Sequence, residues 1–201
     1  MGIDDKSAIA WTGRGAALER EGRYEEALDA HLRAIEINPK LALAWTNKGA
    51  ALANLRRLDA ALQAHKRAIE IEPQLALAWA NKAMVFGAQG QYAEALEASE
   101  RAIEHDSLCG PAWINKGGAL VRLGRHEESL DALAEAIKLE PERAVAWYNK
   151  ACACGQLGRK AEMIDALKRA VESDPALADA ARPDPDFDPY RDDPEFQALI
   201  G

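Results

Sequence analysis

The chain has 201 residues, a formal net charge of -8 at pH 7 and an isoelectric point of about 5.1. This charge repels a phosphate backbone and no cluster of Lys and Arg offsets it, so nucleic-acid binding is not expected. The 48% of apolar residues suffice for a folded core, but no apolar run is long enough to cross a bilayer. The first residues lack the features of an export signal, and three cysteines do not indicate a disulfide framework. We therefore expect a cytoplasmic protein that does not contact membranes.

Tryptophan recurs every 34 residues without an insertion. Because tryptophan is rare, this register indicates true internal repeats, and each Trp is expected to lie in the core. The spacing predicts an N-terminal cap at 1–7, five repeats and a C-terminal capping segment at 178–201. The repeats are 8–41, 42–75, 76–109, 110–143 and 144–177, and their tryptophans are Trp11, Trp45, Trp79, Trp113 and Trp147.

Small residues recur in the same register, at the eighth and twenty-seventh places of each repeat. Small side chains let two helices approach closely, and apolar residues at helical spacing accompany each Trp. We expect each repeat to be a pair of helices, at about residues 8–21 and 24–37 in the first repeat and at the same interval in the others. Five repeats then give ten helices.

The turn inside most repeats is marked by glycine, which adopts the left-handed conformation of a helix C-cap without strain. The second repeat has Arg56 at this place, which predicts either a strained left-handed Arg or an altered turn. Proline follows the second helix of four repeats, and proline cannot continue a helix. The glycines are Gly22, Gly90, Gly124 and Gly158, and the prolines are Pro39, Pro73, Pro141 and Pro175.

This pattern resembles that of the tetratricopeptide repeat family, and the resemblance covers residues 8–177. The segment 147–152, together with the later Asp-Pro-Asp-Phe-Asp-Pro segment, resembles the end-of-array module of bacterial and archaeal members. The resemblance implies an all-α fold, a right-handed superhelical solenoid of antiparallel helix pairs. Each pair buries its apolar face only against its neighbours, so both ends of the array need caps.

Candidate capping residues occur at both ends of the array. Asp4, Asp5 and Ser7 offer oxygen acceptors to the free amides at the start of the first helix. After residue 177, the segment 178–182 looks like a truncated extra helix. We expect the aromatic residues beyond it to fold back over the last helix pair, and these are Phe187, Tyr190 and Phe196.

Asparagine occupies the sixth place of four repeats, which in the family faces the concave groove. A primary amide both donates and accepts hydrogen bonds, so these side chains are expected to bind the backbone of a partner peptide. The alternative is that they cap or cross-link neighbouring helices. The predicted contact residues are Asn47, Asn81, Asn115 and Asn149, joined by Leu43, Thr46, Leu77, Met84, Ile114 and Tyr148 at other groove places.

The family resemblance and the mild, mostly apolar groove places predict a non-catalytic protein–protein interaction module. It is expected to bind a partner peptide or helix in the groove and to act as a scaffold or adaptor in complex assembly. The alternative is a self-associating structural scaffold of stacked solenoids, and we expect a monomer or a weak homo-oligomer. A basic row at the seventh place of each repeat indicates either a charged surface or an acidic partner. It comprises Arg14, Lys48, Lys82, Lys116 and Lys150.

No phosphate loop, nucleophile elbow or metal-binding set occurs in the sequence, so we expect no enzymatic activity and no cofactor. The acids that follow Asp184 match part of a calcium-loop template, but Pro189 stands where that loop needs glycine. Cys152 and Cys154 point about 200° apart on a helix and cannot share one ion. We therefore expect no metal site. The four histidines form no metal-binding spacing either, and we expect them to pack in the structure.

Overall fold

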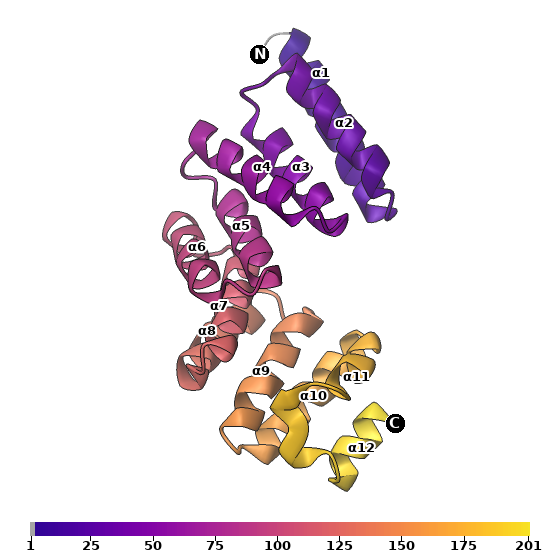
Figure 1. Ribbon diagram of the computed structural model, residues 1–201, viewed down its shortest axis with the longest axis vertical. Helices are drawn as coiled ribbons and strands as arrows, with labels where there is room; N and C mark the ends of the chain where they lie inside the picture. Colours follow the sequence, from indigo (N-terminus) through magenta and orange to yellow (C-terminus); the bar gives the residue numbers. More distant parts are fainter. Residues whose placement is uncertain (1–2) are drawn as a thin grey trace. The chain divides into compact units, whose positions relative to one another are not determined.

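The computed structural model describes residues 3–201, and every regular element in this range is a helix (Figure 1). Two compact parts, divided after Ala112, are described separately. No helix among the described residues is long and apolar enough to span a membrane. The helices are α1 (Ile3–Arg20), α2 (Tyr24–Ile37), α3 (Ala42–Asn54), α4 (Leu58–Ile71), α5 (Ala76–Ala88), α6 (Tyr92–His105), α7 (Gly110–Arg122), α8 (His126–Leu139), α9 (Ala144–Gln156), α10 (Lys160–Ser173), α11 (Ala176–Ala181), the 3₁₀ helix η1 (Pro185–Tyr190) and α12 (Pro194–Ile200).

The N-terminal part consists of three consecutive helix pairs, α1–α2, α3–α4 and α5–α6, and each pair packs on the next through α2–α3 and α4–α5. The C-terminal part contains the later pairs and the tail, with α9 and α10 in extensive contact. Every second helix of a repeat spans the expected residues. The predicted all-α fold of consecutive helix pairs is therefore confirmed within each part.

The first helix begins earlier than expected, at Ile3 instead of Ala8. The expected capping residues Asp5 and Ser7 consequently lie inside α1, while the side chain of Asp4 lies outside the described side chains. Asp5 instead accepts a hydrogen bond of 2.9 Å from the Asn38 side chain. Nothing in this stretch breaks a helix, and acidic residues in a first turn interact favourably with the helix dipole.

The two helices of a repeat meet at the eighth and twenty-fourth places. A Cβ on Gly15 would lie 2.3 Å from Cε1 of His31, and a Cβ on Gly49 would lie 2.3 Å from Cε1 of His65. Both imidazole rings are fully buried, which confirms that they pack in the core. Glycine at the eighth place therefore makes room for the ring on the opposite helix.

The turn residue of the second repeat adopts the strained one of its two predicted conformations. Arg56 has a φ of 61°, while the glycines at the same place have φ values between 71° and 75°. The backbone amide after this turn, on Arg57, donates a 2.9 Å hydrogen bond to the Leu52 carbonyl. The cap geometry is thus kept at the cost of a left-handed arginine.

We expect Arg56→Gly to raise the free energy of unfolding by about 1 kcal/mol, because a left-handed residue with a Cβ costs roughly 1–2 kcal/mol and part of that gain is offset by glycine's larger chain entropy. Urea unfolding measures the change. The matched control, Gly90→Arg, should lower stability by a similar amount. Unchanged stability in both variants would contradict a strained turn.

The buried ring of His65 makes the stability of the fold sensitive to acid. Neither ring nitrogen of His65 has a hydrogen-bond partner among the described residues, and burial with the nearby charge of Lys82 lowers its pKa to about 4. The neutral ring is therefore favoured in the folded state, whereas the unfolded chain takes up a proton near pH 6.5. The contribution of the neutral His65 ring to the free energy of unfolding is therefore fully present above pH 6.5 and is lost as the pH falls toward 4.

Replacing this ring should remove that acid sensitivity. The fourth repeat pairs Gly117 with Leu133 at the same two places, so His65→Leu has a precedent in this chain. Between pH 7 and pH 4.5, the variant should lose about 2–3 kcal/mol less stability than the unmodified chain. Urea unfolding at the two pH values measures this difference, with exposed His105→Gln as control. Equal losses in the His65→Leu variant and the unmodified chain would contradict the assignment.

Candidate functional site

The groove face of a repeat is the side of its first helix that carries the second, fifth, sixth and ninth places. On this face, Leu43, Leu77 and Met84 of the N-terminal part expose 43%, 39% and 44% of their surface. Thr46 and Ile114 are instead buried, and the Thr46 hydroxyl donates a 3.0 Å hydrogen bond to the Ala42 carbonyl. These two predicted contact residues therefore pack inside the structure, and the exposed apolar surface comes from the second and ninth places.

The predicted asparagines lie half-buried at the sixth place of their helices. The side-chain amides of Asn47, Asn81 and Asn149 make no hydrogen bond to any other residue within 3–201, so they do not cross-link helices there. The Asn149 amide nitrogen lies 3.0 Å from where a Cβ on Gly118 would be, which places it beside the ninth place of the preceding repeat. Asn115, the fourth predicted residue, lies half-buried at the same place.

The basic row at the seventh place lies over the tryptophan rings. Each cation is one helical turn from its Trp, and the five distances from charge to ring centre range from 4.7 Å for Lys48 to 5.8 Å for Lys116. Burial against the ring lowers the pKa of Lys48 and of Lys82. A cation over a tryptophan face is stabilising, so packing within each repeat accounts for the row without an acidic partner.

The tryptophans lie between core and surface. Trp147 is buried, and the other four are half-buried, so the expected core position is correct only in part. The indole nitrogens of Trp45, Trp79 and Trp147 donate hydrogen bonds of 2.8–2.9 Å to the carbonyl of the proline six residues earlier. Each of these indoles thereby fixes the turn that leads into its repeat.

Two shallow hollows lie between the helices of a repeat, at equivalent places in the first and fourth repeats. Their volumes are about 210 and 460 Å³. Each is lined by the Trp and cation of the first helix and by acidic residues of the second helix, such as Asp29 and Asp131. Neither is lined by residues of the groove face, and opposite charges from the same repeat line both.

The chain's own tail covers part of the groove face of the fifth repeat, at Tyr148. The Tyr148 hydroxyl donates a 2.7 Å hydrogen bond to Asp184, and its ring packs edge-on against Phe187, with ring centres 5.9 Å apart. Further along α9, Gln156 donates a 3.1 Å hydrogen bond to Asp186. Tyr148, predicted to contact a partner, is therefore engaged by η1 within the same chain.

The apolar residues of the tail share one core with the last helix pair. Phe187 and Phe196 are fully buried with ring centres 5.5 Å apart, and they belong to one cluster with residues of α9 and α10. The Tyr190 hydroxyl donates a 3.0 Å hydrogen bond to the Gly155 carbonyl. These aromatic side chains fasten the tail to the last helix pair.

The groups beneath the tail are held in their neutral forms. Burial and the hydrogen bond to Asp184 raise the pKa of the Tyr148 hydroxyl. Burial, with the nearby carboxylates of Asp184 and Asp186, raises the pKa of the Cys152 thiol. A buried thiol that stays protonated is a poor nucleophile, so this cysteine is not suited to covalent catalysis. Sequence spacing could not indicate this cluster, because its members come from a repeat and from the non-repeating tail.

Comparison with protein families accounts for most of the chain. Two family models, each described as tetratricopeptide repeat, match residues 8–41 and 42–75 in one case and 80–138 and 116–178 in the other. A comparison with curated proteins finds no match.

Several solved structures share the fold at low sequence identity. YrrB, described as a tetratricopeptide repeat protein with an unusual peptide-binding site, is 22% identical over 87% of this chain and 91% of its own, with a TM-score of 0.61. A thermophilic repeat protein from Thermus thermophilus is 20% identical over 87% and 95% of the two chains, with a TM-score of 0.74. PilF of Pseudomonas aeruginosa is 15% identical over 98% of this chain and 90% of its own, with a TM-score of 0.78.

Proposed function

Because this chain belongs to the tetratricopeptide repeat family, we propose that it is a non-catalytic binding module whose groove face holds a segment of a partner protein or peptide. In this role it acts as a scaffold or adaptor in the assembly of a complex. The peptide-binding site named for YrrB, a protein of similar fold, supports a ligand of this class.

The observation that carries the proposal is the unused hydrogen-bonding capacity of the asparagine amides. Asn47 and Asn81 are half-buried, yet their amides make no hydrogen bond to another residue in 3–201. Each amide can donate to and accept from a peptide group of a partner, whatever the partner's sequence. If these amides were already hydrogen-bonded to a neighbouring helix, they would not be available to a ligand.

Exposed apolar side chains flank these amides. Leu43 and Leu77 precede the asparagines by one helical turn, and Met84 follows Asn81 by three residues, so they lie on the same side of their helices. Burying such side chains is favourable by about 25 cal/mol per Å², and methionine adapts to side chains of different shape. The proposed ligand thus pairs its backbone with the amides and its apolar side chains with the leucines and the methionine.

The proposed contacts lie in the N-terminal part and, at Asn115 and Asn149, in the C-terminal part. Tyr148 is left out of the available surface because η1 covers it. The ligand is expected to be a protein segment, extended or helical, and the protein itself a monomer or a weak homo-oligomer. The cytoplasmic location stays a prediction.

The test removes the amides while keeping the helix. The immobilised full chain captures partners from its native lysate, and the affinity of a captured partner is then measured for the unmodified chain and for the Asn47→Ala, Asn81→Ala double variant. Loss of two to four hydrogen bonds at about 0.5–1.5 kcal/mol each should weaken binding at least about fivefold. Circular dichroism checks that the helices remain.

Gln63→Ala is the matched control, because Gln63 carries the same amide group but is exposed on α4, the second helix of the repeat, whereas the groove face belongs to the first helix. Its affinity should equal that of the unmodified chain. Equal affinity in the double variant would refute the role of the amides. If no partner is captured and light scattering shows that mass rises with concentration, the self-associating scaffold is favoured instead.

A further inference from the structure

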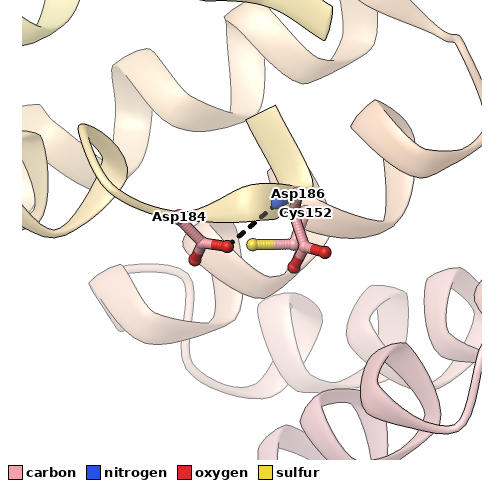
Figure 2. Close-up of side chains that lie close together, drawn as sticks. All are labelled: Cys152, Asp184 and Asp186. Carbon is pink, nitrogen blue, oxygen red and sulfur yellow. Dashed lines mark hydrogen bonds between the residues drawn. The ribbon is translucent and has the colours of Figure 1, made fainter. Parts of the chain in front are cut away.

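A thiol and two carboxylates meet where the tail lies on α9. Cys152 comes from the ninth place of the fifth repeat, and Asp184 and Asp186 come from the start of η1 (Figure 2). One ligand atom of each residue lies within 4.8 Å of the others. We propose that these three side chains bind one divalent zinc ion.

The most telling member of the cluster is Asp186. This residue is only 8% exposed, and its Oδ2 atom is buried without a hydrogen-bond partner among the described residues. Its nearest cation is the Arg122 guanidinium, whose Nη1 atom lies 3.6 Å away, beyond hydrogen-bond distance. A buried carboxylate oxygen that has only a long ion pair and the neighbouring Cys152 thiol beside it is incompletely satisfied, so a metal ion bound to it would be stabilising.

The donor set selects among metal ions. Calcium and magnesium take oxygen ligands, whereas zinc accepts a cysteine sulfur together with aspartate oxygens. Ligands of a tetrahedral zinc ion lie about 3.3–3.5 Å apart, given metal–ligand distances near 2.0–2.3 Å. The ligand atoms of the three side chains would therefore move closer to one another by up to about 1.4 Å, and half-exposed Asp184 has room to move. Water would supply the fourth ligand.

Neighbouring side chains already orient both carboxylates. The Tyr148 hydroxyl donates its hydrogen bond to Oδ2 of Asp184, and Gln156 donates to Oδ1 of Asp186. Each contact leaves the other oxygen of that carboxylate for the ion, although the Asp186 backbone amide also donates a 3.1 Å hydrogen bond to Oδ1 of Asp184. Supporting hydrogen bonds of this kind raise the affinity of metal sites.

Binding reduces the negative charge of the buried cluster. The S–H bond of Cys152 breaks, its proton leaves to solvent, and a zinc–sulfur bond forms. The neutral thiol and two carboxylates carry a charge of -2 before binding, and the thiolate, two carboxylates and zinc ion carry -1 afterwards. The ion would then link α9 to η1 and fasten the tail over the groove face of the fifth repeat.

The full chain, freed of metal, should bind one zinc ion per molecule with a dissociation constant of about 1 μM or tighter in titration calorimetry. Cobalt, used as a spectroscopic substitute, should show a thiolate-to-metal absorption band. Cys152→Ala should weaken zinc binding at least about a hundredfold and abolish the band. Alanine is the natural residue at this place in two repeats, at Ala16 and Ala50.

Two further variants keep the test decisive. Asp184→Asn alters a half-exposed residue and should weaken zinc binding at least about tenfold even if Cys152→Ala disturbs packing. Cys154→Ala removes a buried thiol on the same helix outside the cluster and should leave the affinity unchanged. Absence of one-to-one binding at micromolar zinc, or equal affinity in Cys152→Ala, would overturn the proposal. It is independent of partner binding, because none of these variants changes a residue proposed to contact a partner.

Discussion

The close approach of the two helices in each repeat is the constraint on which the rest of the fold depends. In the first two repeats a glycine faces an imidazole ring with no room for a Cβ, and in the fourth repeat Gly117 faces Leu133 in the same way. This contact sets how near the helices lie, and the indole of the following repeat then fixes the connecting turn through its hydrogen bond to a proline carbonyl.

The parts of the structure that repeat were predictable, and those that do not repeat were not. Periodicity located the second helices to the residue, since five copies report on the same local geometry. The start of α1 was missed because no repeat precedes it and the residues before Ala8 tolerate a helix. At Arg56 the sequence defined two possible conformations, and the cap hydrogen bond of the turn favours the left-handed one.

For the candidate site, the sequence predicted the positions of the asparagines on their helices, but not which neighbouring side chains are exposed and which are buried. Leu43, Leu77 and Met84 are exposed, whereas Thr46 and Ile114 are buried, because the packing of adjacent helices and not the place number decides exposure. The contacts of the tail with α9 join residues that are 30 and 36 positions apart and that occur only once, so no local sequence pattern predicts these pairs.

The surface of the fifth repeat on which the tail packs limits how this array can change in length. Tyr148, Gly155 and Gln156 of the fifth repeat receive the tail through side-chain and backbone contacts specific to them. A gene duplication that inserts a copy of an internal repeat leaves this packing surface intact. A repeat added after residue 177 would separate the tail from it and expose the buried rings of Phe187 and Phe196. Lengthening of the array, in evolution or in engineering, is therefore favoured within the array and opposed at its C-terminal end.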